Sequence, residues 1–303
     1  MKIAAVIVTY NRLDKLKIAL EAYEVQKKPV DDLIIVDNCS TDGTRDFLRD
    51  WENVEGVSNR HVIYMNENLG GSGGFHDGCE FALTLAPDWI LVADDDAYPE
   101  KQMISIFCSY VANHDVDGIS SICSTVINSD NSIACYHRRI LEIKRHYQIV
   151  SRNSREEDYT KESFPISLFS YVGTFLRADS LRKVGLCKKD FFIYYDDSEH
   201  SIRMSKTGQI ICVPSLKVFH DDAFTIEKKV TGKPVLWREY YGTRNKLYTL
   251  LRHYPMAGIY WLLLLIKGGA LTTNGTPKEI KMKRAAVKDA IFSRLGKHPI
   301  YRP

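Results

Sequence analysis

The chain has 303 residues, of which 45% are hydrophobic and 26% are charged, and its net charge is +3. This composition excludes a wholly disordered chain, a collagen-like repeat and a multi-span membrane protein, and the charge is too balanced to indicate nucleic-acid binding. Seven cysteines without a CxxC pair predict neither a disulfide framework nor a thiolate zinc site, and they favour a reducing cytoplasm. The apolar run 259–266 is too short to cross a bilayer, which needs about 20 residues.

The first third of the chain alternates apolar runs with amphipathic segments. We expect strands at 2–9, 33–36, 62–65 and 89–93, and helices at 13–26 and 44–51. A glycine-rich loop after the third strand leads into a third helix that ends near Leu85. This βαβαβ pattern predicts an α/β fold with a mostly parallel sheet and helices on both faces. Ligands bind such sheets at the carboxyl ends of the strands.

The rest of the chain divides into three parts. Residues 126–168 are polar, and we interpret them as an insertion of short strands and a mobile loop. The regular pattern resumes with a helix at 178–184, a strand at 191–195, a helix at 198–206 and a strand at 210–213. From residue 235 the pattern is helical, and from Pro277 it is basic. We therefore expect a catalytic domain over 1–234 and a basic helical region over 235–303.

Three aspartates, Asp94, Asp95 and Asp96, directly follow the fourth predicted strand. Adjacent carboxylates repel one another, so a strand end does not collect them for stability. A divalent cation would relieve the repulsion, and side chains that alternate along an extended turn would let Asp94 and Asp96 face one way. The alternative is a solvated acidic turn or helix cap before Pro99. His220, after a later strand, would complete a donor set that suits Mn²⁺ better than Mg²⁺.

Two further segments carry polar signals. Asn68 begins a run with four glycines at 70–74, which would let the backbone approach a ligand and direct amide N–H groups toward it; a flexible loop is the alternative. The spacing fits neither a Rossmann fingerprint nor a P-loop. Asp196 and Asp197 follow two tyrosines at a predicted helix N-terminus, where negative charge is stabilised. One acid suffices as an N-cap, which leaves the second for chemistry.

These motifs together resemble a known enzyme family. The run VTYNR at 8–12, the run VDNCSTDGT at 36–44 and the aspartate triplet are similar to those of family-two inverting glycosyltransferases with the GT-A fold. The glycine-rich run, the acid pair at 196–197 and His220 resemble more narrowly the bacterial galactofuranosyltransferases, as does the run YYGTRN at 240–245. The resemblance covers about residues 1–250. Rhamnosyltransferases of the same family share several of these motifs.

The resemblance implies a donor and a pocket for it. The donor would be UDP-galactofuranose, and the acceptor would be a saccharide on a lipid carrier or a surface glycan. Asp37 would accept the N3–H of uracil, and the uridine and diphosphate would be lined by Thr9, Tyr10 and Arg12. The donor sugar would be bordered by Asn68, Gly70 and Gly71. Asp94 and Asp95 would also contact the sugar nucleotide, and the ligands of Mn²⁺ or Mg²⁺ would be Asp94, Asp96 and His220.

The resemblance also implies which residue carries the chemistry. Asp197 would be the general base, and Asp196 would hold acceptor hydroxyls or cap the helix. Glu199 would be the next candidate for the base. Tyr195 stands where galactan-polymerising relatives carry Trp, and we expect the chain to lack the large N-terminal β domain of the long polymerases. We therefore expect the addition of one or a few sugars rather than processive polymerisation.

Several alternatives remain open from the sequence. Within the class, the chain could be a dTDP-rhamnose transferase. A nucleotidyltransferase would need a basic phosphate loop near the first strand, where only Arg12 and Lys15 are available, and an inactive glycan-binding module should have lost an acid at 94, 96 or 197. We expect a cytoplasmic enzyme, with the run 259–266 and the basic residues after Pro277 contacting the inner face of the plasma membrane. The alternative for this tail is a helix packed on the catalytic domain with a solvated basic face.

Overall fold

The computed structural model describes residues 1–144, 148–221 and 236–302. Its main sheet is built from β1 (Ile3–Thr9), β2 (Asp32–Asp37), β3 (Asn59–Tyr64), β4 (Trp89–Asp94), β5 (Ala97–Pro99), β6 (Ile119–Asn128), β9 (Phe164–Ile166), β11 (Thr174–Arg177) and β12 (Gln209–His220). A second, smaller sheet contains β7 (Arg138–Ile143), β8 (Ile149–Asn153) and β10 (Leu168–Phe169). The helices are α1 (Leu13–Glu24), α2 (Thr44–Glu52), α3 (Gly70–Thr84), α4 (Met103–Asn113), α5 (Ala178–Val184), α6 (Asp196–Met204), α8 (Leu236–His253), α9 (Pro255–Lys267) and α10 (Pro277–Ile291).

The order of strands in the main sheet is β3-β2-β1-β4-β11-β6-β12-β5, with β9 also paired to β12. Strands β1 to β4 pair in parallel, and β6 pairs in parallel with β12. Strand β11 runs antiparallel to β4 and to β6 between these two parallel groups. The mostly parallel sheet predicted from the sequence is therefore confirmed, with β11 reversed near its centre and β5 and β9 antiparallel to β12. The last residues of β1 and β4, Thr9 and Asp94, lie at the same edge of the sheet.

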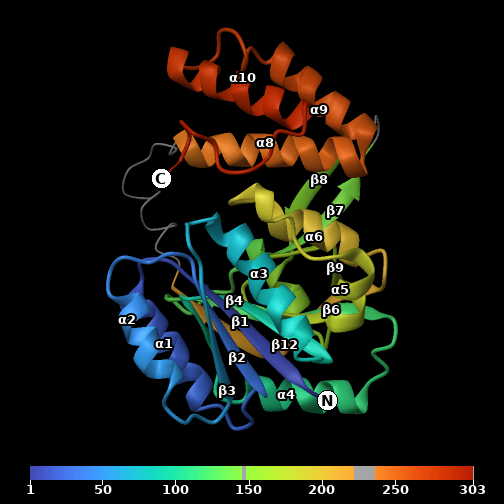
Figure 1. Cartoon of the computed structure of the whole chain (residues 1–303). Helices are drawn as coiled ribbons and strands as arrows, with labels where there is room; N and C mark the ends of the chain where they lie inside the picture. Colours follow the sequence, from blue (N-terminus) through green and yellow to red (C-terminus); the bar gives the residue numbers. More distant parts are fainter. Residues whose placement is uncertain (145–147, 222–235, 303) are drawn as a thin grey trace.

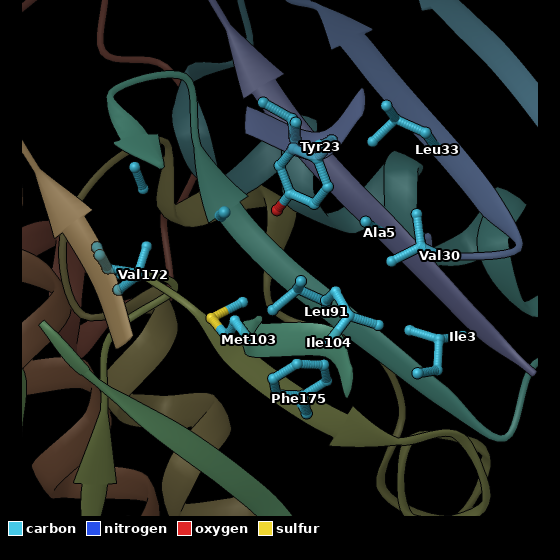
Figure 2. Close-up of a cluster of buried hydrophobic side chains, with 14 of the residues drawn as sticks. Ile3, Ala5, Tyr23, Val30, Leu33, Leu91, Met103, Ile104, Val172 and Phe175 are labelled. Atoms are coloured by element: carbon cyan, nitrogen blue, oxygen red, sulfur yellow. The ribbon is translucent and has the colours of Figure 1, made fainter. Parts of the chain in front are cut away.

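Helices cover both faces of this sheet because side chains alternate along each strand. On one face, Ala5 of β1, Leu33 of β2 and Leu91 of β4 pack against residues of α1 and α4 such as Tyr23 and Met103. Figure 2 shows residues of this cluster, with side chains from the strands and from the helices packed together. The alternate positions, among them Val6, Ile34 and Ile90, pack with α3, α5 and α6 on the other face. The predicted placement of helices on both faces is thus confirmed.

The glycine-rich run is the first part of helix α3 and not a loop, so the predicted loop is wrong. A Cβ on Gly74 would lie 2.4 Å from Cγ1 of Val8, and a Cβ on Gly78 would lie 2.5 Å from Cγ1 of Val6. These glycines let the backbone of α3 lie directly on β1. A Cβ on Gly71, by contrast, would meet no described atom within 4 Å. Most of the glycines therefore serve close packing of the helix.

Residues 191–195 do not form the strand that the sequence predicts. The 3₁₀ turn η4 (Lys189–Phe191) leads instead into an irregular segment in which Phe192, Tyr194 and Tyr195 have φ values of 66°, 65° and 67°. Residues other than glycine rarely adopt this left-handed backbone conformation. Helix α6 then begins at Asp196, two residues before the predicted start. We call residues 190–195 the strained loop.

The predicted insertion, 126–168, forms the end of β6, the 3₁₀ turns η1 (Cys135–His137) and η3 (Glu156–Thr160), the β7–β8 hairpin and β9 over its described residues. Beyond it, the three C-terminal helices lie together at one end of the molecule, next to α6 and the β7–β8 hairpin (Figure 1). Helix α10 packs on α8. None of the described helices combines the length and the apolar character needed to span a membrane.

Candidate active site

A cleft of about 510 Å³ lies at the carboxyl end of β4. Four parts of the chain that are distant in sequence supply its acidic and imidazole side chains: β4, the turn before β7, the start of α6 and the end of β12. Its lining includes Gly71, Asp94, His137, Asp196, Asp197 and His220. The cleft therefore lies where the fold predicts a ligand, and it contains candidates both for a cation site and for a base.

The aspartate triplet divides into two different environments, as alternation along the chain predicts. Asp95 turns inward, where it accepts hydrogen bonds from the Thr9 hydroxyl at 2.7 Å and from Nη1 of Arg12 at 3.2 Å. Asp96 accepts a hydrogen bond from the same Nη1 at 2.7 Å and lies 3.2 Å from Nε2 of His220. Arg12 thus bridges two of the three carboxylates, and part of their mutual repulsion is relieved by the chain itself.

Asp94, Asp96 and His220 bring their ligand atoms within 4.8 Å of one another. Burial and the charge of Asp96 raise the pKa of Asp94. Burial alone would raise the pKa of Asp96 too, but the hydrogen bond and charge of His220 together with Arg12 lower it. Two carboxylates and one imidazole fit a divalent cation of the Mn²⁺ type, and a cation there would reverse the raised pKa of Asp94 by favouring its ionised form.

The second acidic pair begins helix α6. Burial, followed by the charge of Asp197, raises the pKa of Asp196. Burial also raises the pKa of Asp197, and the positive charge of Arg139 and the hydrogen bonds from Ser198 partly oppose this effect. These contacts form a chain, because Nη2 of Arg139 donates to the Ser198 hydroxyl at 2.7 Å and that hydroxyl donates to Asp197 Oδ1 at 2.9 Å. Asp197 is therefore a half-buried carboxylate in the cleft with a raised pKa, which suits a general base.

The strained loop that leads to this pair is held from α8. The amide Nδ2 of Asn245 donates to the carbonyl oxygens of Phe191, Ile193 and Tyr194 at 3.0, 3.0 and 2.8 Å. The guanidinium of Arg244 donates to Asn245 Oδ1 at 2.8 Å. Both side chains are fully buried, so the left-handed conformations of the loop are imposed by a helix that follows some 50 residues later.

Glu199 does not line the cleft. Its carboxylate has almost no accessible surface, and its oxygens bond Nε of Arg203 at 2.9 and 3.0 Å and Nε2 of His253 at 3.0 Å. Burial would raise its pKa, but these two partners outweigh burial and lower the pKa to about 2. Glu199 is thus a permanently ionised structural group that ties α6 to α8, and it is a poor candidate for the base.

The predicted donor residues fall into two groups. Thr9 and Arg12 belong to the aspartate network described above, and Tyr10 is exposed beside them. Asp37 is fully buried, where it accepts hydrogen bonds from Nε of Arg45 at 2.7 Å and from the Ser40 amide at 2.9 Å. A contact between Asp37 and uracil would therefore require the Arg45 ion pair to move.

The other group lies at the start of α3. Asn68 Oδ1 accepts hydrogen bonds from the Gly70 amide at 2.8 Å and from Nδ2 of Asn38 at 3.2 Å. Gly70 is buried with a φ of 73°, and a Cβ there would lie 1.9 Å from the carbonyl oxygen of Phe192. Of the three predicted sugar-bordering residues, Gly71 lines the cleft, whereas Asn68 and Gly70 shape the turn that presents it.

Two residues of the cleft escaped the sequence analysis because they lie in the predicted insertion. His137 packs edge-on against His220, with ring centroids 5.2 Å apart, and its Nδ1 lies 2.7 Å from the Ser170 hydroxyl. Its buried Nε2 has no hydrogen-bond partner in the described parts of the chain. Burial and the charge of His220 lower the pKa of His137, so its imidazole is neutral. Arg139 is the second such residue, and the adjacent arginines at 138–139 were the available signal.

A comparison with known families decides the class of the protein. The sequence pattern of glycosyl transferase family 2 matches residues 4–185, which is more than half of the chain. The chain belongs to glycosyl transferase family 2. The resemblance stated from the motifs is therefore confirmed, and the protein is a glycosyltransferase.

Individual members of glycosyl transferase family 2 are similar over longer stretches. The galactofuranosyltransferase GlfT1 of Mycolicibacterium smegmatis is 29% identical over 208 residues, which cover 68% of this chain and 66% of that protein, just under two thirds of its length. The dTDP-rhamnosyl transferase RfbF of Shigella flexneri is 27% identical over 266 residues, covering 84% of this chain and 82% of that protein. Both sugar classes that the motifs left open are thus represented among the relatives of this glycosyltransferase.

Solved structures support the fold. The crystal structure of GalNAc-T7 with UDP, GalNAc and Mn²⁺ matches 96% of this chain and 56% of that chain with a TM-score of 0.63 and 11% identity. At this identity the similarity concerns the fold, and it confirms the GT-A architecture expected for this family-2 glycosyltransferase.

Proposed function

We propose that this glycosyltransferase is a metal-dependent inverting enzyme that transfers galactofuranose from UDP-galactofuranose to a saccharide acceptor in surface polysaccharide synthesis. The observation that carries the proposal is the arrangement of the two acidic groups in one cleft. The cluster of Asp94, Asp96 and His220 lies at the carboxyl end of β4, and Asp197 faces the same cleft from the start of α6. Inversion needs such an arrangement, because the acceptor hydroxyl must approach opposite the departing nucleotide.

Each group has a distinct part in this proposal. Asp94, Asp96 and His220 would hold Mn²⁺ or Mg²⁺, which supplies positive charge where the leaving diphosphate becomes more negative. Asp197 takes the proton of the acceptor hydroxyl as the new glycosidic bond forms, since that hydroxyl is a weak acid. Its raised pKa brings it closer to the pKa that a base needs near neutral pH. Tyr194 and Tyr195, which line the same cleft, offer rings against which an acceptor sugar can lie.

The choice of donor rests on the relatives. GlfT1 is named for galactofuranose and RfbF for dTDP-rhamnose, and the narrower motifs favour galactofuranose. A nucleotidyltransferase is disfavoured because the two basic residues near the first strand are already paired: Arg12 contacts Asp95 and Asp96, and Lys15 contacts Asp221.

Calorimetric titration with a panel of sugar nucleotides in Mn²⁺ tests this proposal. We expect UDP-galactofuranose to bind and to be turned over, dTDP-rhamnose to be rejected, and EDTA to abolish transfer until Mn²⁺ is restored. Asp96→Ala should lose metal-dependent binding. Turnover of dTDP-rhamnose alone would replace the donor assignment, and full activity of Asp96→Ala in a metal-free sample would overturn the metal assignment.

The proposed acceptor is a lipid-linked saccharide, with peripheral contact between the C-terminal helices and an anionic membrane surface. Helix α9 exposes large apolar side chains, and α10 exposes basic ones: Met256, Ile259, Leu263, Leu264 and Ile266 on α9, and Lys278, Lys281, Arg284 and Lys288 on α10. Liposome flotation of the full chain should depend on anionic lipid and should weaken when the four basic residues are changed to Gln. Equal flotation of both proteins would exclude contact through α10.

A further inference from the structure

A second cavity, of about 350 Å³, lies between the β7–β8 hairpin and helices α8 and α9. It is continuous in its lining with the candidate active site, because Arg139, Tyr195 and Ser198 line both. Ser198 also bonds Asp197. A molecule in this cavity would therefore lie next to the proposed base, on the side away from β4.

Two cations line this cavity, and the charge of one of them, Arg139, is partly balanced by Asp197 behind Ser198. Arg139 comes from β7 and Lys246 from α8, and among the described residues that line the cavity there is no Asp or Glu. The ammonium of Lys246 lies over the ring of Trp261, 4.7 Å from its centroid. Burial and the charge of Arg139 lower the pKa of Lys246. Two like charges held together in a partly buried wall cost free energy unless an anion joins them.

A third polar group in the same wall is unsatisfied. Thr249 lies one helical turn after Lys246, on the same face of α8, and it lines the cavity. Its side chain is 2% exposed, and its hydroxyl has no hydrogen-bond partner in the parts of the chain that the structure covers. Buried hydroxyls are nearly always hydrogen-bonded. Lys246, Thr249 and Arg139 thus place three donors in one wall. Arg139 already donates to the Ser198 hydroxyl, whereas the Thr249 hydroxyl has no acceptor among the described residues.

Apart from Gln148, Ser151 and Ser198, the remainder of the wall is apolar or aromatic, and it leads to the surface. Leucine, isoleucine and aromatic side chains line it, among them Leu141, Leu168, Ile202, Leu250, Trp261 and Leu264. Leu264 is also 42% exposed on α9, in line with the exposed apolar residues of that helix. An anion with a long apolar chain matches this combination, because the cations bind the charged group and the apolar wall leads the chain outward.

We propose that this cavity binds the phosphate group of a lipid-linked acceptor, with Lys246, Arg139 and Thr249 donating to its oxygens and the α9 wall taking the lipid chain. The first sugar beyond the phosphate then reaches Asp197 through the lining that the two cavities share. This inference rests on the proposed function, since it supplies the acceptor half of that reaction.

Calorimetric titration with farnesyl diphosphate tests the site directly. The titration is made in EDTA, so that metal-dependent phosphate binding at Asp94, Asp96 and His220 does not contribute, with inorganic diphosphate and farnesol as separate probes. We expect farnesyl diphosphate to bind more tightly than either probe and not to be displaced by UDP. Lys246→Gln should weaken it at least about tenfold, as the loss of a charge-assisted hydrogen bond implies. Lys246→Arg should retain the affinity for farnesyl diphosphate.

Two controls separate this site from the rest of the molecule. Lys183→Gln, which changes an exposed lysine on α5, should bind farnesyl diphosphate like the parent chain. Thr249→Val is a second test variant, which should weaken binding with little change in side-chain shape. Lys246→Gln should keep the parent affinity for UDP with Mn²⁺, which shows that the donor half is folded. Equal affinity for inorganic diphosphate, displacement by UDP, or unchanged binding by Lys246→Gln would each overturn the proposal. If no sugar nucleotide bound in the titration panel, that would count against the proposed function. The farnesyl diphosphate titration would still test this cavity.

Discussion

Asn245 donates a hydrogen bond from Nδ2 to the carbonyl oxygen of Tyr194 over 2.8 Å, and this contact connects helix α8 to the loop that precedes the proposed base. Residues in the left-handed conformation cost about 1–3 kcal/mol each, and three of them occur within four positions of that loop. The buried amide of Asn245, oriented by Arg244, offsets this cost. The C-terminal helices are therefore part of the active site rather than an appendage.

Asn245→Ala should slow the reaction far more than it weakens donor binding. The loop would relax from its strained conformation and displace Asp197, and a displacement of about 1 Å can cost on the order of 10²-fold in rate. Steady-state kinetics should show this loss in kcat, while titration of UDP with Mn²⁺ stays near the parent value. Glu239→Gln, an exposed change on the same helix, serves as the control. An unchanged kcat in Asn245→Ala would show that the loop holds its shape alone.

Asp197→Asn should lower turnover by about 10²- to 10⁴-fold, the usual effect of removing a general base. Binding of UDP and Mn²⁺ should remain nearly normal, because Asp197 is not among the proposed ligands of the cation, Asp94, Asp96 and His220. Asp196→Asn should instead weaken acceptor binding more than the chemical step. If Asp197→Asn keeps more than about a tenth of the rate, the base lies elsewhere in the cleft. Glu199 is not a suitable alternative base, because its carboxylate is already bonded to Arg203 and His253.

The parts of the fold that follow local periodicity could be predicted from the sequence. The strands and helices of the first 94 residues, and the split of the aspartate triplet into inward and cleft-facing groups, follow from alternation along buried strands. The chemistry of the residues suggested grouping Asp94, Asp96 and His220, but it could not place them together, since the sequence does not say that the end of β12 pairs with β5, directly after the aspartate triplet. The structure brings these three ligand atoms together.

The sequence-based predictions that failed concern segments whose conformation is determined by residues distant in the sequence. The strained loop has the aromatic composition of a strand, but Arg244 and Asn245 impose another conformation on it from α8. The glycine run suggested a ligand loop, whereas Gly74 of the run lies against Val8 of β1 and Gly70 lies against the Phe192 carbonyl of the strained loop. No local pattern reports either contact. The same holds for Arg139, whose polar surroundings in the sequence indicated a surface insertion.

Two adjacent glycines at the start of α3 should respond differently to the same change. Gly70→Ala forces a side chain into a φ of 73° and places its Cβ 1.9 Å from the Phe192 carbonyl oxygen, which should cost about 2–4 kcal/mol of stability. Gly71→Ala has open space and helical geometry, so stability should be kept while the methyl group narrows the cleft and raises the KM for the donor. Urea denaturation of both variants measures the first effect, and equal stability would show that α3 can move away from the strained loop.

Arg139→Met should move the acidic limb of the pH–rate profile to higher pH. The positive charge of Arg139 opposes the effect of burial on Asp197, so removing it raises the pKa of that carboxyl further. A base works only when it is ionised, and a higher pKa means that ionisation requires a higher pH. Arg138, fully buried nearby, exerts a smaller effect of the same sign. The measurement is kcat against pH with saturating donor and acceptor, and Arg182→Met on the surface of α5 should leave the profile unchanged. A lower rate with an unmoved acidic limb would mean that Arg139 acts only on binding, and that Asp197 does not set the pH dependence.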